Sequence, residues 1–505
     1  NTDFLLSYHD KVLKDVDVKV SAGANAMNST SRTYNAYVDG LVVPDVYKFT
    51  NGAASPTLVV KDGNRKVNSI YGLAAFGYKD KYFIDFTARK DWWSTLPLNS
   101  NSMFYPSVNA SVILSDVFTL PARISFLKLR ASVAQAGFDA KSPYMTKKYF
   151  EESEFAGSAT APTVLFNDHL LPEKQTSFET GIELRLFKGR VRADLTYYRN
   201  NTENQILNIP IDPSTGYSRK VINGGKVRNT GVEVVLNTKN ISAKDFTWST
   251  NITWAKNNNR VVSLPAEIEN DFLIINTGGN AYQQTKVGGT SGDIYGFGFL
   301  RTPDGKVIYN DKGLPVQPTN VQYIGSAYPA WKGGIQNEFR YKDFRFSFLL
   351  DGQYGGIIYS QTHHKMSEQG KLKHTLYGRE ENYIIGDGVV DDGTGKYIPN
   401  TTKVLPNVYY AEYYRRANVE SNSLDASFLK LREARVEWAL PKRFLGKFFQ
   451  GASLALYGRD LLLLSSFPIF DPETAALNGT TIMPGVEIGQ LPSTRTMGVN
   501  LTVKF

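Results

Sequence analysis

The stretch Asp343–Tyr354 reads DFRFSFLLDGQY, and it indicates the fold class of this chain. Its apolar positions are Phe344, Phe346, Phe348 and Leu350, and Arg345, Ser347, Asp351 and Gln353 hold the alternate polar positions. Because successive side chains of a β-strand point to opposite faces, this alternation places one row on an apolar face and the other on a polar face. The stretch therefore predicts a strand between an apolar and a polar environment.

The same alternation recurs along the chain, for example in Arg190–Asn201, in Phe246–Trp254 and in Thr496–Phe505. It predicts fifteen antiparallel strands. Their predicted ranges are 3–10, 15–26, 66–78, 81–91, 104–114, 124–136, 175–187, 190–201, 229–239, 245–256, 331–341, 343–355, 427–439, 451–460 and 494–505. The strand at 427–439 changes parity near Glu433, which predicts a β-bulge there.

The connections between these strands alternate between short and long. The short turns are Lys11–Lys14, Lys79–Asp80, Ser115–Arg123, Lys188–Gly189, Asn240–Lys244, Lys342 and Leu440–Gln450. The long loops are Met27–Arg65, Trp92–Met103, Gly137–Lys174, Thr202–Arg228, Lys256–Ala330, Gly356–Ala426 and Leu461–Ser493. Short turns on one rim and long loops on the other are typical of outer-membrane β-barrels, whereas compact soluble domains rarely contain so many long loops. The sequence therefore predicts an all-β, transmembrane antiparallel barrel with long extracellular loops.

Composition is consistent with this fold. The chain has 505 residues, 13% aromatic residues and no cysteine. It lacks the run of about 18 apolar residues that a membrane-spanning helix requires, but a barrel strand needs only alternate apolar positions. The net charge of +9 is dispersed among 48 acidic residues, so a nucleic-acid partner is not expected.

Several short motifs resemble the SusC-like TonB-dependent transporters of Bacteroidetes outer membranes, and the resemblance runs along essentially the whole chain. The motifs are Ile124–Arg130, Leu171–Lys174 with Glu179–Gly181, Tyr197–Thr202, Pro213–Tyr217, Asn229–Glu233, Asp351–Gly356, Ser427–Arg432, Gly458–Leu461, Asp471–Glu473 and the terminal Phe505. Each motif is weak alone, but their order and spacing together make the resemblance specific.

The resemblance implies a 22-stranded barrel in the outer membrane, with an N-terminal plug and a segment that contacts TonB. It also implies a SusD-like lipoprotein lid, energy from the TonB–ExbB–ExbD complex, contact with outer-membrane lipid and lipopolysaccharide, and a dimer of transporter–lid pairs. Residues 1–505 would then be the C-terminal part of the barrel. Because fifteen strands is an odd number, we expect N-terminal strands of the barrel to lie outside this chain. The resemblance implies that the plug and the TonB box also lie outside it.

No motif for covalent chemistry is present. The GxxxxGK[ST], GxSxG and HExxH patterns are absent, so we predict no enzymatic activity and no cofactor. His363 and His364 are adjacent in a long loop, with His374 further on, and are interpreted as surface-loop residues rather than as metal ligands. We predict no metal site.

Ligand binding is better supported than catalysis. The candidate substrate-binding residues are Tyr409, Tyr410, Tyr413, Tyr414, Arg415, Trp92 and Trp93. For the tyrosines, packing beneath the long loop or contact with a lid is an equally good interpretation, and the outer aromatic girdle is favoured for the two tryptophans. Asp351 and Gln353 are expected to point into the lumen, towards the substrate path or, preferably, the plug.

The function implied by the resemblance is active import of nutrient oligomers, either glycans or peptides. The alternative is an outer-membrane barrel that binds a partner or host surface, or that forms a passive pore. A soluble β-sandwich enzyme is a more distant third interpretation.

Overall fold

The structure is a computed structural model, and it describes residues 1–140, 142–147, 149–152, 157–265, 268, 272–446, 448–478 and 481–505. The chain forms two compact units. The first unit comprises Asn1–Val117, Arg130–Thr180 and Asn200–Val227, and the second comprises Phe118–Leu129, Gly181–Arg199 and Arg228–Phe505. Each unit is described by itself below.

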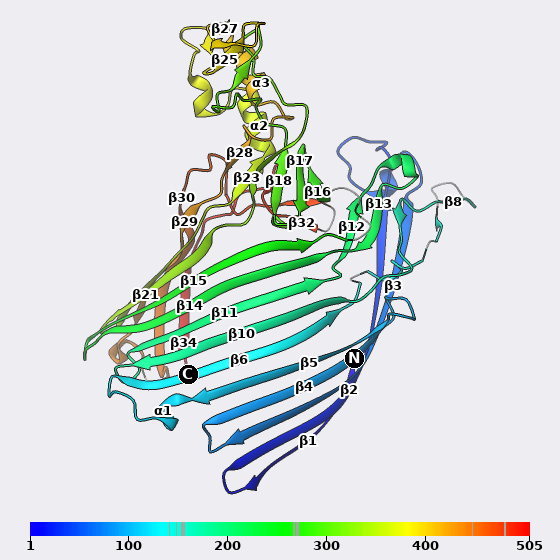
Figure 1. Cartoon of the computed structure of the whole chain (residues 1–505). Helices are drawn as coiled ribbons and strands as arrows, with labels where there is room; N and C mark the ends of the chain where they lie inside the picture. The colour runs from blue at the N-terminus through cyan, green and yellow to red at the C-terminus, as the bar shows by residue number, and fades with distance from the viewer. Residues whose placement is uncertain are drawn as a thin grey trace. The chain divides into compact units, whose positions relative to one another are not determined.

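The main sheet contains fifteen strands, and each strand neighbours the next one of the sheet in chain order (Figure 1). They are β1 (Thr2–Leu13), β2 (Val16–Tyr37), β3 (Thr57–Tyr78), β4 (Tyr82–Trp93), β5 (Ser102–Ile113), β6 (Ile124–Phe138), β10 (Glu173–Leu186), β11 (Val191–Glu203), β14 (Lys226–Ser242), β15 (Phe246–Ser263), β21 (Trp331–Tyr341), β22 (Phe344–Tyr354), β29 (Phe428–Ala439), β30 (Gly451–Ser465) and β34 (Thr496–Lys504). All fifteen predicted strands are therefore confirmed.

The register of the second unit forms a continuous apolar row across six strands. The directly paired residues are Trp248, Phe339, Phe346, Val436, Leu456 and Val499. The row one residue away is mostly polar and consists of Thr247, Arg340, Arg345, Glu437, Ala455 and Asn500. The two rows face opposite sides of the sheet, because the side-chain period of a strand is two.

The apolar row is not covered by protein. Leu456 is 60% exposed and Val499 is 65% exposed. Burying one such side chain contributes about 1.5–3 kcal/mol, so a water-facing row of this kind would be unfavourable. An uncovered apolar row on one face, with a mostly polar row on the other, is typical of the strands of a transmembrane β-barrel.

The predicted β-bulge is present at Arg432. Adjacent residues of β22 pair with Leu431 and Glu433, so Arg432 is the extra residue in β29. Leu429 before the bulge and Val436 after it are both exposed apolar residues. One has an odd and the other an even number, so in a regular strand they would point to opposite faces. Without the bulge, the charged side chains after Arg432 would be turned to the apolar face, because a slip of one residue inverts every following side chain.

The prediction of a long loop at Met27–Arg65 is wrong for most of its length. β2 and β3 continue to pair as far as Tyr37 and Thr57, so that only residues 38–56 connect them. This extension is polar, and Arg32 donates from Nε to Asp62 across the strands at 2.6 Å. Apolar alternation did not reveal it, because both faces of the extension are solvated and neither selects apolar residues.

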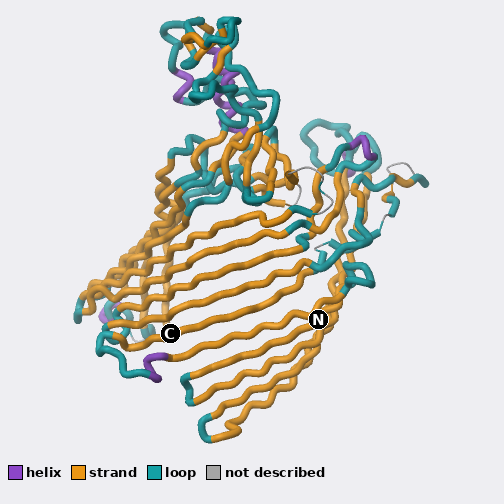
Figure 2. Tube along the Cα trace, viewed as in Figure 1, coloured by secondary structure: helices purple, strands orange, loops and turns teal. Residues whose placement is uncertain are grey.

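Helices are short and occur outside the main sheet (Figure 2). They are α1 (Leu114–Val117), α2 (Gln361–Glu368) and α3 (Pro406–Tyr413), with 3₁₀ turns η1 (Phe49–Asn51), η2 (Pro213–Thr215), η3 (Lys373–Leu376) and η4 (Lys442–Phe444). Within the described ranges, none of the helices is long and apolar enough to cross a membrane.

The long loops carry their own small sheets. In the second unit these comprise β16 (Phe272–Gly278), β17 (Ala281–Lys286), β18 (Asp293–Gly296), β19 (Ile308–Tyr309), β20 (Gln322–Ser326), β23 (Ile357–Ser360), β24 (Ile384–Ile385), β25 (Val389–Asp391), β26 (Tyr397–Pro399), β27 (Lys403–Val404), β28 (Ser423–Asp425), β31 (Ala476–Asn478), β32 (Thr481–Met483) and β33 (Val486–Glu487). The first unit adds β7 (Glu151–Glu152), β8 (Ala159–Thr160), β9 (Val164–Leu165), β12 (Ile206–Pro210) and β13 (Arg219–Asn223).

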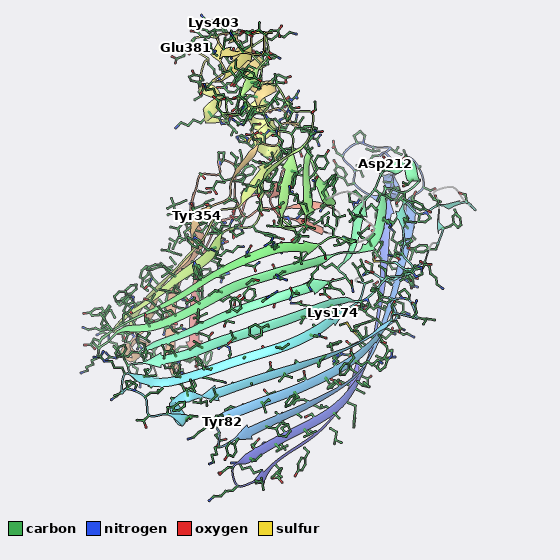
Figure 3. The ribbon with its side chains drawn as sticks, viewed as in Figure 1. Tyr82, Lys174, Asp212, Tyr354, Glu381 and Lys403 are labelled. Atoms are coloured by element: carbon green, nitrogen blue, oxygen red, sulfur yellow. The ribbon has the colours of Figure 1, made fainter. Side chains whose placement is uncertain are left out.

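The three longest loops of the second unit, residues 264–330, 355–427 and 466–495, pack together, and we call the described part of them the loop module. Figure 3 shows Tyr354 at the end of β22, where the module begins, and Glu381 and Lys403 at its opposite end. The module is the part of this unit that offers pockets and polar clusters outside the regular wall.

Candidate functional site

The base of the loop module is a shared apolar core. All three loops contribute fully buried side chains, among them Ile294, Tyr359, Val419 and Met483. β23 pairs with β28 from its own loop and, in parallel, with β33 from the last loop. The loops are therefore mutually supporting, and a long loop that packs in this way is a typical carrier of function.

An aromatic cluster forms the core of the outer part of the module. Tyr409 and Tyr413 lie on α3 with ring centroids 5.4 Å apart, and the hydroxyl groups of Tyr409 and Tyr309 lie 3.2 Å apart. The hydroxyl of Tyr410 lies within hydrogen-bond distance of two carbonyl oxygens, those of His374 and Tyr377, and can donate to either. Its ring stacks on that of Tyr414, with 6.2 Å between the ring centroids. Burial raises the pKa of Tyr409, Tyr410, Tyr413 and Tyr414, so these four phenols stay neutral at physiological pH. The structure thus describes the predicted tyrosines as packing residues of the module.

Arg415 follows α3 and forms an ion pair with Glu412, with 3.3 Å between Nη1 and Oε2. Of the predicted cluster, Tyr410 also borders an open pocket, which is described below. Binding of a substrate by the cluster remains a prediction.

The interpretation of His363 and His364 as surface-loop residues is wrong, because both are buried in α2. The Nδ1 atom of His363 lies 3.0 Å from the Oδ1 atom of Asn422, and the ring of His363 contacts that of His374. His364 donates from Nδ1 to the carbonyl oxygen of Tyr414 at 2.6 Å, since a carbonyl can only accept. The two neighbours face different partners because successive helical residues point about 100° apart.

Acidification is expected to loosen the loop module. Burial lowers the pKa of His363, His364 and His374, while the unfolded module keeps the ordinary value of about 6.5. Protons therefore bind preferentially to the unfolded module. The folded module has its full stability above about pH 6.5, and this stability decreases as the pH falls towards the lower pKa values of the folded state. Hydrogen exchange of α2 and α3, corrected for intrinsic rates, should accelerate between pH 7.5 and 5.5.

Variants that replace His363 or His374 with glutamine should show less of this pH dependence. Carboxylates ordinarily titrate below about pH 5.5. Parts of the protein that contain carboxylates but no histidine should therefore keep constant protection from hydrogen exchange, and they serve as an internal control. Equal protection of α2 at both pH values would contradict the expectation.

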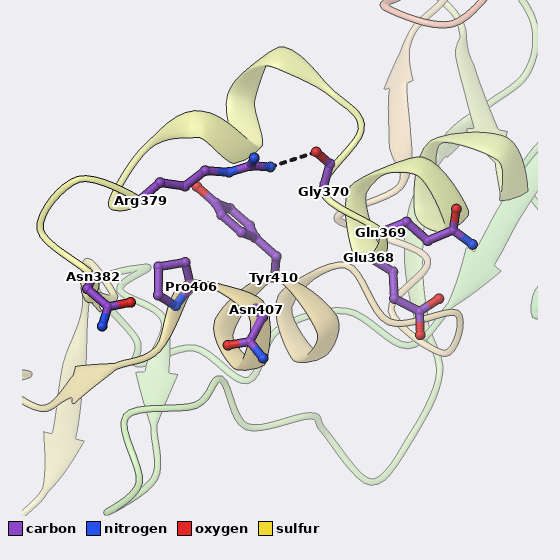
Figure 4. A pocket seen from close by; sticks show the side chains of 8 residues that line it. All are labelled: Glu368, Gln369, Gly370, Arg379, Asn382, Pro406, Asn407 and Tyr410. Atoms are coloured by element: carbon purple, nitrogen blue, oxygen red, sulfur yellow. Dashed lines mark hydrogen bonds between the residues drawn. The ribbon is translucent and has the colours of Figure 1, made fainter.

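A pocket of about 320 Å³ opens beside α2 and α3 (Figure 4). Glu368 and Gln369 border it from the end of α2, Arg379 and Asn382 from the segment after η3, and Asn407 from the start of α3. In Figure 4, Arg379 extends past Tyr410 towards Gly370. Sequence reasoning did not single out these polar residues, because no local pattern marks them and only the packing of the loop brings them together.

An ion network with a buried ion pair at its centre joins the polar face of the sheet to the last loop. Lys430 is 2% exposed and donates from Nζ to both carboxylate oxygens of Asp471, at 2.8 and 2.7 Å, and also to Glu473. Arg432, the bulge residue, donates from Nε to Asp351 at 2.8 Å and from Nη2 to Glu473 at 2.5 Å. Lys430 and the arginine of the bulge thus fix the loop to the wall.

The network connects motifs that are widely separated in the sequence. Asp351 belongs to the motif Asp351–Gly356, and Asp460, which lies 3.5 Å from Arg432, belongs to Gly458–Leu461. Gln353 donates from Nε2 to the carbonyl oxygen of Ala426 at 2.9 Å. Both predicted lumen residues therefore have partners in their own unit, and contact with a plug remains a prediction.

The two tryptophans belong to the first unit, at the end of β4. Trp93 is 3% exposed and packs against Val67, Leu96 and Leu170 in an apolar core beneath the loops. Trp92 is half-buried, with the ammonium group of Lys90 5.1 Å from its ring centroid. Trp93 is therefore a packing residue of the loop base.

The alternating connections, the exposed apolar row and the loop module agree with a known family. Residues 2–339 match the family described as TonB dependent receptor-like, beta-barrel. The chain belongs to this family. The main sheet is accordingly the wall of a transmembrane β-barrel, as the alternation predicted.

Curated relatives of this TonB-dependent receptor family extend the match to the whole chain. The TonB-dependent receptor P26 of Formosa agariphila is 26% identical over 100% of this chain and 53% of the relative. The TonB-dependent receptor SusC of Bacteroides thetaiotaomicron is 22% identical over 86% of this chain and 43% of the relative. The chain thus spans about half the length of the curated relatives it matches.

Among solved structures, the RagAB peptide importer in its closed-closed state matches with a TM-score of 0.79 and 17% identity, over 100% of this chain and 55% of the matched chain. At this identity the likeness concerns the fold alone. The resemblance to SusC-like receptors that the sequence motifs indicated is confirmed by the family match and by these relatives.

Proposed function

We propose that this chain forms the C-terminal part of an outer-membrane importer of nutrient oligomers that is energised through TonB. The observation that carries the proposal is the match of residues 2–339 to the TonB-dependent receptor family, together with the likeness to SusC. The remaining half of a protein as long as its relatives would supply the plug, the TonB-contacting segment and the other barrel strands.

The structure supports separate roles for the two faces of the wall. The exposed apolar row, which includes Phe346 and Leu456, would contact lipid, and the polar row, which includes Arg345 and Asn500, would face the lumen. The loop module would lie on the extracellular side, where it can meet substrate and a SusD-like lipoprotein lid. A dimer of such transporter–lid pairs is part of the proposal.

The cargo would be a glycan or a peptide. The RagAB structure that this chain resembles is named as a peptide importer. The likeness to SusC leaves both kinds of oligomer in the proposal. The proposed role is binding and transport of an intact oligomer.

Uptake measurements in the native bacterium test this proposal. Deletion of the gene should reduce uptake of labelled oligomers to background, and complementation with the full-length protein should restore it. Depletion of TonB or collapse of the proton gradient should abolish the restored uptake, because the wall itself supplies no energy.

Uptake that continues without TonB would indicate a passive pore and would contradict the proposal. Co-purification of the full-length protein in detergent gives a second readout, since a lipoprotein lid should accompany it. Normal growth and uptake in the deletion strain, with the protein serving only in surface adhesion, would favour the partner-binding alternative.

A further inference from the structure

The pocket of the loop module contains a fixed cation. Arg379 donates from Nε to the carbonyl oxygen of Thr375 at 2.7 Å, and from Nη2 to the carbonyl oxygen of Gly370 at 2.6 Å and to the hydroxyl of Thr375 at 3.0 Å. Gly370 has a φ of +68°, and a Cβ atom there would lie 2.7 Å from Nη2. Glycine thus allows both the turn and the close approach of the guanidinium group.

The charge of Arg379 is not neutralised by its partners. All three acceptors are neutral oxygens, and no carboxylate forms an ion pair with Arg379 in the part of the chain that the structure describes. The hydrogen bonds use the N–H groups of Nε and Nη2 and leave the two N–H groups of Nη1. An arginine that is held by neutral oxygens and keeps free donors is prepared to receive an anion.

The other walls of the pocket are polar and adaptable. Asn382, Asn407 and Gln369 present carboxamide groups, which both donate and accept hydrogen bonds. Within the described ranges, no side-chain hydrogen bond of these three amides is found. Asn382 has a φ of +59°, so its position is set by a left-handed turn rather than by a flexible extended segment.

The opposite end of the pocket carries a carboxylate. Glu368 lies 3.0 Å from the ammonium of Lys365 and 3.6 Å from Nε2 of His364. A second anionic group bound beside this carboxylate would be repelled, because like charges repel each other. The pocket therefore suits a ligand with one negative charge at the Arg379 end and neutral polar groups elsewhere.

We propose that this pocket binds a carboxylate group of the imported oligomer, with Nη1 of Arg379 as the donor. The amides of Asn382 and Asn407 hold neighbouring hydroxyl or amide groups of the same ligand. This inference rests on the proposed import function and deepens it. The carboxylate has two sources, the C-terminus of a peptide and a uronic acid of a glycan.

Binding of four probes to the purified full-length protein distinguishes these sources. The probes are trialanine, trialanine amide, the methyl glycoside of galacturonic acid and the methyl ester of that glycoside, measured by titration calorimetry. We expect one acid to bind and its neutral partner to bind ~10- to 100-fold more weakly, because a hydrogen bond to a charged group is lost. The acid that binds identifies the source.

Variants then locate the site. R379Q should weaken binding of the acid by ~10- to 100-fold, whereas binding of its neutral partner should change little. Asn382→Ala and Asn407→Ala break no described hydrogen bond and should weaken it by roughly two- to tenfold. Lys396→Gln removes an exposed cation of the same module outside the pocket and should leave binding unchanged.

The inference is overturned if neither acid binds, if the neutral partners bind equally well, or if R379Q binds the acid as tightly as the wild type does. Uptake through TonB would still stand in those cases, since it is measured separately. Conversely, if the protein bound an acid in a manner that depends on Arg379 but imported nothing, the carboxylate site would be supported and the import function would be refuted.

Discussion

Replacement of Lys430 with methionine is expected to release the last loop from the wall and to destabilise the docked state by about 3–5 kcal/mol. Lys430 and Asp471 are both almost fully buried, and their ion pair is 2.7 Å long. Methionine fills a similar volume but leaves the carboxylate of Asp471 buried without its cation. An unpaired buried charge costs more than the intact pair contributes.

The measurement is hydrogen exchange or protease sensitivity of residues 466–478 in the full-length protein. Lys306→Met is the matched control, because it removes an exposed ion pair with Asp304, 3.4 Å long, in the same module. Exposed pairs contribute about 0–1 kcal/mol, so the control should leave protection nearly unchanged. Equal protection of the loop in K430M and in the wild type would show that the network does not hold it.

The same network predicts a dependence on acidic pH. Burial alone would raise the pKa of Asp471, but hydrogen bonds from Lys430 and Ser493 outweigh it and lower the pKa. Burial likewise opposes ionisation of Glu473, and hydrogen bonds from Arg432 and Lys430 lower its pKa. The contribution of both carboxylates is therefore present above their unfolded pKa values of about 4 and is lost as the pH falls through the lower folded values.

The second large effect is expected on the lipid side of the wall. Leu456→Arg should destabilise the folded barrel by about 2–4 kcal/mol if this position lies near the middle of the bilayer, because the charge must enter hydrocarbon. Leu456 pairs directly with Val436 and Val499, so it lies in the centre of an apolar patch. Equilibrium unfolding of the full-length protein in phospholipid vesicles gives the difference in free energy.

Asn500→Arg is the matched control, since Asn500 lies next to Val499 on the opposite, polar face of β34. It should change the free energy of unfolding by less than about 1 kcal/mol, because a lumen substitution stays in a polar environment. A similar loss in both variants would mean that the two faces do not differ in environment, and the proposed orientation of the wall would be wrong.

The wall was accessible from the sequence because its signal is local and repeats. Each strand alternates every second residue, so Asp343–Tyr354 alone identified its own two faces, and the parity change near Glu433 located the bulge. The limit of this signal is visible in the β2–β3 extension. Asn28–Tyr37 and Thr57–Lys66 pair outside the apolar band, where solvent on both sides removes the alternation that marks a strand.

The loop module was decided by tertiary structure. The tyrosines of α3 have the same residue types whether they bind a ligand or fill a core, and only the packing of Tyr309 and Phe299 against them shows that they are buried. His363 and His364 looked like loop residues for the same reason. Burial depends on contacts from distant segments, which no local pattern encodes.

The polar clusters show the same division. The sequence by itself determined the fifteen strands, their order and the family motifs, because these follow from period-two patterning and short turns. Only the tertiary structure brought Asp351, Arg432 and Glu473 into one network, and Arg379 and Asn407 to one pocket. Ion pairing and pocket formation require side chains within about 4 Å, and such proximity between residues far apart in the chain is set by how the loops pack.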